Sequence, residues 1–104
     1  MDTLDALEAT IAQRLGADPA TSYVAALAAR GRGKIAQKVG EEAVETVIAA
    51  LDGDNSALAA EAADLVFHLL ILLRASGVTL DAVRAELARR EGVSGLDEKA
   101  ARKD

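Results

Sequence analysis

Residues 34–74 read KIAQKVGEEAVETVIAALDGDNSALAAEAADLVFHLLILLR, and this stretch decides the fold of the chain. It predicts two helices, over residues 34–51 and 54–75, because helix formers dominate both segments and the sequence DGDN at residues 52–55 favours a turn. Residues three or four apart share one face of a helix, so charged side chains at these spacings gather on common faces. A pair of helices that fold back on each other is therefore expected at the centre of the protein.

Carboxylates on both predicted helices are the first functional signal. Glu42 pairs with Glu45 on the first helix, and Glu41 directly precedes them. Glu61 pairs with Asp64 on the second helix. If the helices fold back on each other, five acids converge on a small volume, where like charges repel and are costly to desolvate unless a cation holds them.

The first helix of the pair is predicted to be amphipathic. At 100° per residue, charged side chains of both signs form one stripe: Lys34, Lys38, Glu41, Glu42 and Glu45. Apolar side chains fall mainly on the opposite side: Ile35, Val39, Ala43, Val47 and Leu51. Gly40 lies in mid-helix, where glycine costs about 1 kcal/mol relative to alanine, and this predicts close approach by another helix or a ligand.

The second helix is predicted to be buried. Residues 65–73 are apolar on every side except at His68, and a helix that is apolar all round belongs in a protein interior. Glu61 and Asp64 interrupt it, and buried carboxylates are rare unless they are paired or bound to a metal. For His68 we expect a hydrogen-bonded core position more than a catalytic one.

Composition indicates one all-α domain. The chain has 104 residues, of which 51% are hydrophobic and 28% charged, as in ordinary globular domains. Good helix formers occur throughout, β-branched runs are few, and the only aromatic residues are Tyr23 and Phe67. We expect a helical bundle of about five helices over residues 1–91, followed by a polar, loosely ordered tail over residues 92–104.

The first and last helices have recognisable starts. The first is expected to begin at Asp2 or Thr3 and to end near Gly16. The last is expected to begin around Thr79, with two apolar side chains directed inward: Val83 and Leu87.

A short helix over residues 22–29 is expected between them, with Ser22 as its cap and Tyr23 as a core aromatic residue. The sequence RGRG at residues 30–33 predicts a flexible basic connector, because paired glycines disfavour helix. These basic residues border the acidic stretch that follows.

Several partners and locations are disfavoured. The chain has no cysteine, which excludes disulfides, thiolate zinc sites and thiol catalysis. A net charge of -5 argues against nucleic-acid binding. The first residues lack the basic and apolar segments of a signal peptide, and the nine residues at 65–73, which include His68, are too few to cross a bilayer. We therefore expect a cytoplasmic protein with no membrane partner.

Two interpretations of the acids remain open. The acids on the first helix suit a solvated face with Lys38, and those on the second suit salt bridges to Lys34, Lys38 or an arginine. Alternatively, the acids hold a divalent cation. Hard oxygen ligands favour Mg²⁺ or Mn²⁺, whereas the lack of thiols and the single histidine disfavour zinc.

Basic residues border the acids: Arg30, Arg32, Lys34 and Lys38. Cations on one side of a metal site and carboxylates on the other form a plausible cradle for pyrophosphate, with the metal bridging phosphoryl oxygens. The alternative for the basic residues is ordinary surface solubility.

The sequence EEAVE at residues 41–45, followed by EAAD at 61–64, resembles the EExxE…ExxD signature of the all-α, MazG-like nucleotide pyrophosphohydrolases. More narrowly, the chain from residue 22 to about residue 91 is similar to the phosphoribosyl-ATP pyrophosphohydrolase family. The matching motifs are Ser22-Tyr23, Lys34-Ile35, KVGEEA at 38–43 and EAADL at 61–65 with His68.

The resemblance implies Mg²⁺-dependent hydrolysis of phosphoribosyl-ATP to phosphoribosyl-AMP and pyrophosphate, the second step of histidine biosynthesis. Carried over by position, the implied metal ligands are Glu42, Glu45, Glu61 and Asp64. Glu41 is implied as a further ligand or as a group that orients water, and the implied phosphate-binding residues are Lys34, Lys38 and Arg30. The resemblance also implies a homodimer whose paired helices complete the bundle, in a stand-alone form without a cyclohydrolase domain.

Two rival functions remain. A related enzyme of the same superfamily would act on ordinary or damaged nucleoside triphosphates with the same metal chemistry. A non-catalytic helical dimer would serve as an interaction module, and would neither bind magnesium nor need Glu61.

Overall fold

The computed structural model of the protein describes residues 2–91, which form five α-helices and no strand. The helices are α1 (Thr3–Arg14), α2 (Tyr23–Ala29), α3 (Arg32–Asp52), α4 (Asn55–Ala75) and α5 (Leu80–Arg90). The predicted all-α fold of about five helices is confirmed. The predicted tail over residues 92–104 lies outside the described residues.

Four of these helices begin at a side chain that caps the helix N-terminus. Asp2, Ser22, Asp54 and Thr79 each accept a hydrogen bond from the backbone NH three residues further along. In α1 the Asp5 carboxylate accepts in return from the backbone NH of Asp2, which completes a capping box. Each cap satisfies an NH group that has no partner within its helix, and each is worth about 1 kcal/mol.

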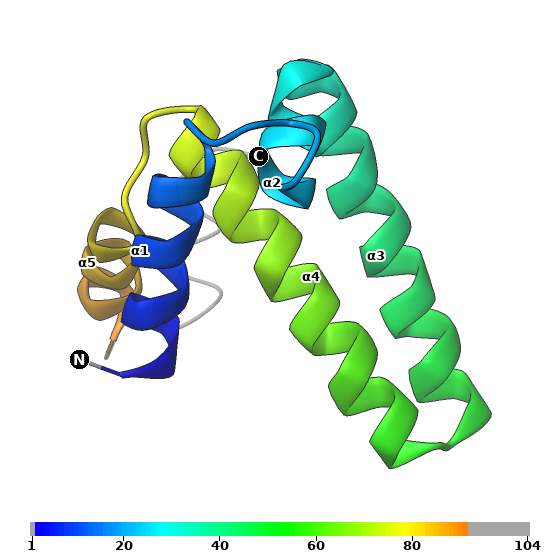
Figure 1. Ribbon diagram of the computed structural model, residues 1–104. Coiled ribbons are helices and arrows are strands. Elements are labelled where there is room, and N and C mark those ends of the chain that lie inside the picture. The colour runs from blue at the N-terminus through cyan, green and yellow to red at the C-terminus, as the bar shows by residue number, and fades with distance from the viewer. Residues whose placement is uncertain (1, 92–104) are drawn as a thin grey trace.

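A tight turn folds α3 and α4 back on each other. Gly53 ends α3 with a φ of 75°, a left-handed conformation that glycine adopts without a steric penalty. Asp54 caps α4 immediately afterwards. The two helices therefore run antiparallel and side by side (Figure 1), which confirms the predicted helix pair.

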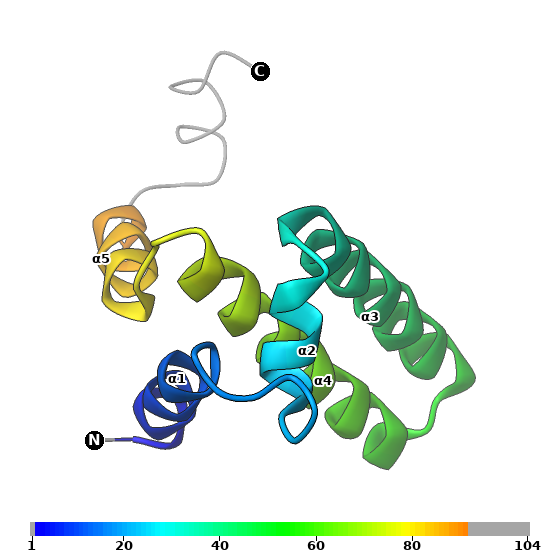
Figure 2. The ribbon, with the colours of Figure 1, turned by 45° about the horizontal axis from the view of Figure 1, so that its top comes forward.

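The hydrophobic core lies at one end of this helix pair. There α1 and α2 pack against α4 and the first turns of α3 (Figure 2), and the largest fully buried side chains are Ile11, Ile35 and Ile71. The other end of the pair, with the turn at Gly53, projects away from α1, α2 and α5 (Figure 1). In the projecting half, α3 and α4 cover only each other.

The connector between α2 and α3 is shorter than the predicted range of residues 30–33. Only Arg30 and Gly31 separate α2 from α3, and Gly31 takes a φ of 96° at the α3 N-cap. One glycine suffices for this change of direction, and the packing of Ile35 into the core stabilises a first helical turn that includes Gly33. Lys34 is consequently held on a helix and not on a loop.

The prediction that the second helix of the pair is buried is wrong for the single chain. The buried residues of α4 are His68, Leu70 and Ile71, all towards its C-terminal end, whereas Val66 and Leu69 are exposed. A chain of this size has too few helices to cover α4 on both sides. By length and composition alone α4 is also able to cross a membrane, but the core helices of globular proteins pass the same test.

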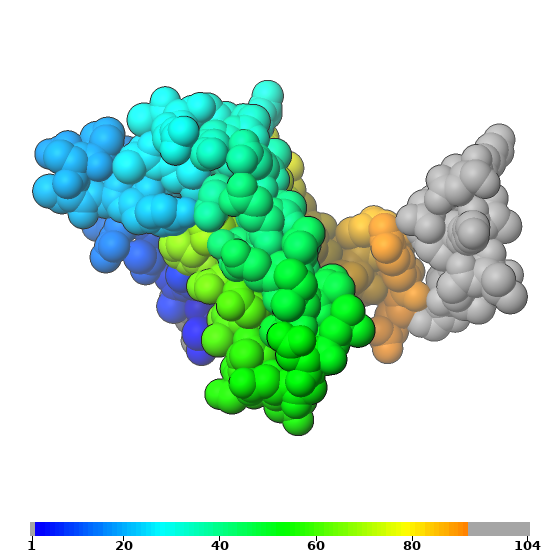
Figure 3. Space-filling model, turned by 90° about the vertical axis from the view of Figure 1, so that its right-hand side faces the viewer, coloured from blue at the N-terminus to red at the C-terminus, as the bar shows by residue number. Residues whose placement is uncertain are grey.

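One long face of α3 is exposed (Figure 3), and apolar side chains lie on it. Val47 and Leu51, predicted on the apolar side of this helix, are 57% and 82% exposed, and Val44 and Ile48 are exposed beside them. The close approach predicted at Gly40 is also absent among the described residues, since a Cβ atom there would meet nothing within 4 Å. Both observations have one cause, which is that no described helix covers this side of α3.

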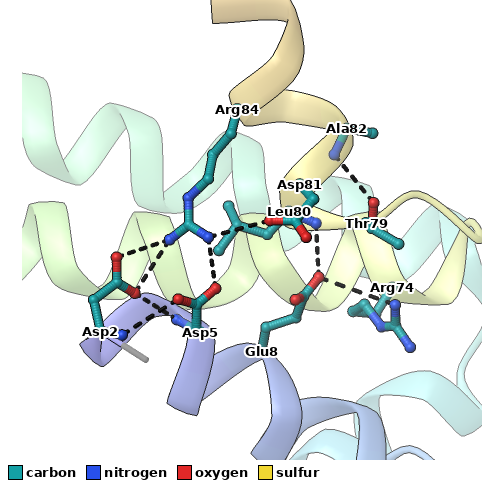
Figure 4. A network of polar contacts seen from close by, with 9 residues as sticks. All are labelled: Asp2, Asp5, Glu8, Arg74, Thr79, Leu80, Asp81, Ala82 and Arg84. Atoms are coloured by element: carbon teal, nitrogen blue, oxygen red, sulfur yellow. Dashed lines mark hydrogen bonds and ion pairs between the residues drawn. The ribbon is translucent and has the colours of Figure 1, made fainter. Parts of the chain in front are cut away.

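Polar contacts fasten α5 to α1 (Figure 4). The Arg84 guanidinium binds the carboxylates of Asp2 and Asp5, and the Leu80 backbone NH donates to Glu8 at 2.6 Å. Leu87, predicted to point inward, is 60% exposed. Arg84 of α5 already contacts Asp2, which lies at the start of α1. The last turn of α5 extends beyond this point and has no described helix to pack against.

Candidate active site

Three carboxylates meet where α3 and α4 face each other. One oxygen from each of Glu42, Glu45 and Glu61 lies within 4.8 Å of the other two. Glu42 and Glu45 are one helical turn apart on α3, and the antiparallel pairing places Glu61 of α4 opposite them. Five acids were expected to converge here, and three of them do so. We call these three residues the acidic cluster.

The acidic cluster is arranged to receive a cation. Glu42 is only 7% exposed, and Glu61 is half-buried. Each has one buried carboxylate oxygen, Oε2, that forms no hydrogen bond within the described residues. A buried acceptor without a partner is costly, and neighbouring carboxylates add repulsion, so a divalent cation would satisfy both requirements.

Lys38 connects the acidic cluster with its surroundings. Its ammonium lies 3.6 Å from Glu42 Oε1 and 3.4 Å from Glu41 Oε2. Burial lowers the pKa of Lys38, but the hydrogen bond to Glu41 and the nearby negative charges raise it by more, so the pKa lies above its ordinary value. Lys38 is therefore a fixed positive charge beside the carboxylates.

Glu41 lies outside the acidic cluster. Its Oε1 accepts a hydrogen bond from Gln37 Nε2 at 2.9 Å, and this bond, together with that from Lys38, lowers the pKa of the Glu41 carboxyl. The side chain is exposed and lines a neighbouring cavity between α2 and α3, which is described below. Glu41 thus remains ionised, one residue away from the buried Glu42.

Asp64 is also outside the group of three close carboxylates. It lies three residues after Glu61 on α4 and is exposed, whereas its backbone carbonyl accepts a hydrogen bond from His68 Nδ1 at 2.8 Å. The structure therefore brings together three of the four predicted metal ligands and leaves Asp64 at the edge of the group.

A cavity of about 470 Å³ opens beside the acidic cluster towards the turn between α3 and α4. Glu45 and Glu61 line it together with Asp52 and Asp54 and a wall of Ile48, Ala49 and Ala57. Residues 52–55 were expected only to form the turn. The DGD sequence was a visible signal, but the fold is needed to place its acids beside the cluster.

A second cavity, of about 340 Å³, lies between α2 and α3. We call it the basic pocket, because it contains all three predicted phosphate-binding residues: Arg30, Lys34 and Lys38. The remaining lining residues are Tyr23, Ala26, Leu27 and Glu41. Lys38 borders both the basic pocket and the acidic cluster, so one extended ligand can reach both.

Tyr23 lines the basic pocket, contrary to its predicted position. It was expected in the core, but it is 52% exposed and lines the basic pocket. Its hydroxyl lies 2.8 Å from Nε2 of His68, which is buried as expected. Ser22, Val24 and Ala25 beside Tyr23 are buried, so nothing in the local sequence marked it as an exposed position.

The antiparallel pair, its acidic cluster and the adjoining basic pocket define an all-α protein with the charge arrangement of a metal-dependent phosphohydrolase. The chain belongs to the phosphoribosyl-ATP pyrophosphohydrolase family, which it matches over residues 4–91. This confirms the resemblance seen in the sequence.

Relatives of known name agree with this membership. The chain is 66% identical to the phosphoribosyl-ATP pyrophosphatase of Erythrobacter litoralis over the full length of both. It is 67% identical to the phosphoribosyl-ATP pyrophosphatase of Rhizorhabdus wittichii, over 96% of this chain and 94% of the relative. The same named enzyme of Rhodospirillum rubrum is 60% identical over 98% of this chain and 87% of the relative.

Proposed function

We propose that this protein hydrolyses phosphoribosyl-ATP to phosphoribosyl-AMP and pyrophosphate, the second step of histidine biosynthesis, in the cytoplasm. The observation that carries the proposal is the pair of buried, unpartnered oxygens of Glu42 and Glu61 inside a cluster of three carboxylates. In a chain of the phosphoribosyl-ATP pyrophosphohydrolase family, such a cluster suits the metal-assisted hydrolysis of a phosphoanhydride.

The acidic cluster would hold Mg²⁺, with Mn²⁺ as a second possibility, through Glu42, Glu45 and Glu61. Asp64 is the proposed fourth ligand, one turn further along α4. When bound, the ion would neutralise charge on the phosphate oxygens and so make the phosphorus atom more open to attack by water. Carboxylate oxygens are the ligands that these hard cations prefer.

The side chains of the chain itself supply the remaining chemistry. Glu41 is the residue proposed to orient the attacking water and to accept a proton from it, since it is exposed and lies one residue before the ligand Glu42. The water oxygen bonds to the α-phosphorus as the α–β anhydride bond breaks, and the electron pair leaves with pyrophosphate.

Basic side chains would stabilise the charge that develops during this step. Lys38 lies beside Glu42 and is positioned to pair with the departing pyrophosphate. Lys34 lines the same basic pocket and is proposed as a second contact of the pyrophosphate. Arg30, which also lines this pocket, is proposed to bind a different phosphate of the substrate.

We infer that the enzyme is a homodimer. The exposed face of α3 displays Val44, Val47, Ile48 and Leu51 in a row, and Gly40 continues this row towards the start of the helix. A contiguous apolar face next to a polar site is typical of a protein interface. A second copy would cover this face, complete the helical bundle and use the close approach that Gly40 permits.

The deciding experiment measures pyrophosphate release from phosphoribosyl-ATP, ATP and dATP at equal concentrations, each with and without Mg²⁺. Release from phosphoribosyl-ATP alone, and only with Mg²⁺, is the expected result. Comparable release from ATP and dATP would assign the protein to the housekeeping nucleoside triphosphate pyrophosphohydrolases. Release from none of them would favour the non-catalytic interaction module.

A further inference from the structure

The π surfaces of this chain are few and gather in one place. The sequence has one tyrosine, one phenylalanine, one histidine and no tryptophan. Tyr23 and Phe67 stack with their ring centroids 6.3 Å apart and 25° between planes, and His68 meets both rings edge-on. Nucleobases bind proteins largely by stacking on such rings, so a base that stacks on an aromatic ring of this protein must do so here.

Among the three rings, Tyr23 is the one presented to a cavity. It is 52% exposed and forms part of the wall of the basic pocket, whereas Phe67 is half-buried and packs against the core. Ala26 and Leu27 follow on the same face of α2 and add an apolar surface of small and medium side chains. An aromatic wall above an apolar floor suits the flat, apolar faces of a purine.

Hydrogen bonds hold the Tyr23 ring in place. His68 is 6% exposed, and its Nδ1 lies 2.8 Å from the backbone oxygen of Asp64. Because a carbonyl only accepts, Nδ1 donates, which leaves Nε2 of the neutral ring to accept the Tyr23 hydroxyl at 2.8 Å. The ring is thus anchored at its hydroxyl before any ligand arrives, and preorganisation of this kind favours binding.

The rise along α4 from Glu61 of the acidic cluster to His68, the partner of Tyr23, suits the length of one nucleotide. His68, which holds Tyr23, lies seven residues after Glu61 on α4, or about 10 Å along the helix axis. Lys38 lies between, at the border of pocket and cluster. A triphosphate at the cluster can therefore extend its base into the basic pocket.

We propose that Tyr23 stacks on the adenine ring of the substrate and that His68 is a positioning residue for Tyr23. Arg30, which lines the same pocket at the other end of α2, then pairs with the 5′-phosphate of the phosphoribosyl group carried by the adenine. This inference rests on the proposed function, since it names the groups that recognise phosphoribosyl-ATP.

The first test is a kinetic comparison of Tyr23→Ala with Tyr23→Phe. Loss of the ring in Tyr23→Ala should raise KM for phosphoribosyl-ATP by about 10- to 100-fold with a much smaller change in kcat. Tyr23→Phe keeps the ring and loses only its anchor, so its KM should rise about threefold. Pyrophosphate has no base, so its inhibition constant should be the same in both variants. Equal KM values for the wild type and Tyr23→Ala would overturn the stacking role.

The positioning role of His68 needs a double-mutant cycle. His68→Leu and Tyr23→Phe each remove the same hydrogen bond, so the double variant should show the same KM as either single variant. His68→Gln places an amide oxygen near the position of Nε2 and should restore part of the affinity. Fully additive effects on KM, or no rescue by glutamine, would show that His68 serves the core alone.

Arg30 is tested by selectivity. Arg30→Gln should lower kcat/KM for phosphoribosyl-ATP by about 10-fold or more. It should leave the weak binding of ATP unchanged, because ATP lacks the phosphoribosyl group and its 5′-phosphate. Equal losses of affinity for both nucleotides would remove Arg30 from the recognition of the phosphoribosyl group.

A binding measurement separates this inference from the proposed function. In EDTA, ATP or phosphoribosyl-ATP is added to the protein, and nuclear Overhauser contacts between adenine protons and the single tyrosine ring are recorded. Contacts are expected for the wild type, and their absence for a bound nucleotide would overturn the stacking role. Contacts with ATP together with hydrolysis of ATP but not phosphoribosyl-ATP would leave the stacking role intact and overturn the proposed function.

Discussion

Glu42 on α3 and Glu61 on α4 face each other across the helix pair, and each keeps its buried Oε2 without a hydrogen-bond partner in the described part of the chain. Lys38 satisfies only the other oxygen of Glu42. Two acceptors buried side by side are unfavourable on their own, so a positive charge bound at this position would stabilise the folded protein.

Glu42→Gln and Glu61→Gln test directly whether the acidic cluster binds a cation. Each should lower kcat by about 100-fold or more, because the ion supplies several kcal/mol of transition-state stabilisation and about 1.4 kcal/mol corresponds to tenfold in rate. The wild type should gain about 2.7 kcal/mol of unfolding free energy at about 100 times the Kd for Mg²⁺, and both variants should lose this gain. Thermal unfolding with and without Mg²⁺ measures it.

The matched control is Glu91→Gln, an exposed glutamate at the end of α5. It should keep both turnover and the stabilisation by Mg²⁺. In the absence of metal, Glu42→Gln should unfold at the same temperature as the wild type or higher, since one source of carboxylate repulsion is gone. A large loss of stability without metal would instead assign Glu42 a purely structural role.

Asp64→Asn should abolish turnover while the fold stays intact. Asp64 is exposed on α4, one turn after Glu61, so removal of its charge leaves no buried group unsatisfied. Circular dichroism checks the fold, and pyrophosphate release checks turnover. Unchanged magnesium-dependent activity in both Asp64→Asn and Glu42→Gln would sink the proposed site.

Two glycine substitutions should change stability in opposite directions. Gly53→Ala forces a side chain into the left-handed conformation at φ 75° and should cost about 1 kcal/mol, or about 4–8 °C in Tm. Gly33→Ala lies inside α3, where an added Cβ meets nothing within 4 Å, and should stabilise the protein by up to about 1 kcal/mol. Thermal denaturation measures both, and equal signs would contradict the assigned backbone conformations.

The contact between α1 and α5 should weaken in acid. The hydrogen bond from Arg84 is the main cause that lowers the pKa of Asp5 below its ordinary 3.8. The unfolded chain therefore binds the proton first, so this contribution to stability is complete above the unfolded pKa and is lost as the pH falls through the folded pKa. Between about pH 5 and pH 3 the Tm of the wild type should fall more steeply than that of Arg84→Gln. Parallel curves would contradict the prediction.

Glu86 should add a second acid-sensitive contribution. Hydrogen bonds from Arg89 and Arg90 lower its pKa to about 2, so the same sign applies. The contribution is present above the ordinary value of 4.5 and is lost as the pH falls towards 2. Glu86→Gln should therefore flatten the acid limb of the stability curve, as measured by chemical denaturation across this range.

Val47→Asp should convert the proposed homodimer into a monomer. A charge in the middle of the exposed α3 face would be buried without a partner on association. Analytical ultracentrifugation gives the mass, and pyrophosphate release shows whether the lone subunit is active. Leu87→Asp, an equally exposed apolar position on α5, is the control and should leave the mass unchanged. A wild-type monomer at all concentrations would contradict the inferred dimer.

Local signals determined the helices. Ser22 and Thr79 were recognisable as helix starts, and Asp2 and Asp54 were among adjacent candidates, because a capping side chain acts on backbone NH groups only three residues away. The glycine at position 53 predicted the turn for an equally local reason. At the connector the same reasoning failed, because the burial of Ile35 in the core outweighs the low helix propensity of Gly33.

The sequence by itself determined the five helices and the central antiparallel pair, and it predicted that five acids would converge there, since the period of the α-helix and one tight turn suffice for this. Only the structure reduces the five acids to Glu42, Glu45 and Glu61. Tertiary structure alone decided the rest. Tyr23 meets His68 across 45 positions of sequence, and no local rule links residues so far apart. The exposure of Leu51 likewise follows from which helices pack together, and that choice depends on the burial of the whole chain.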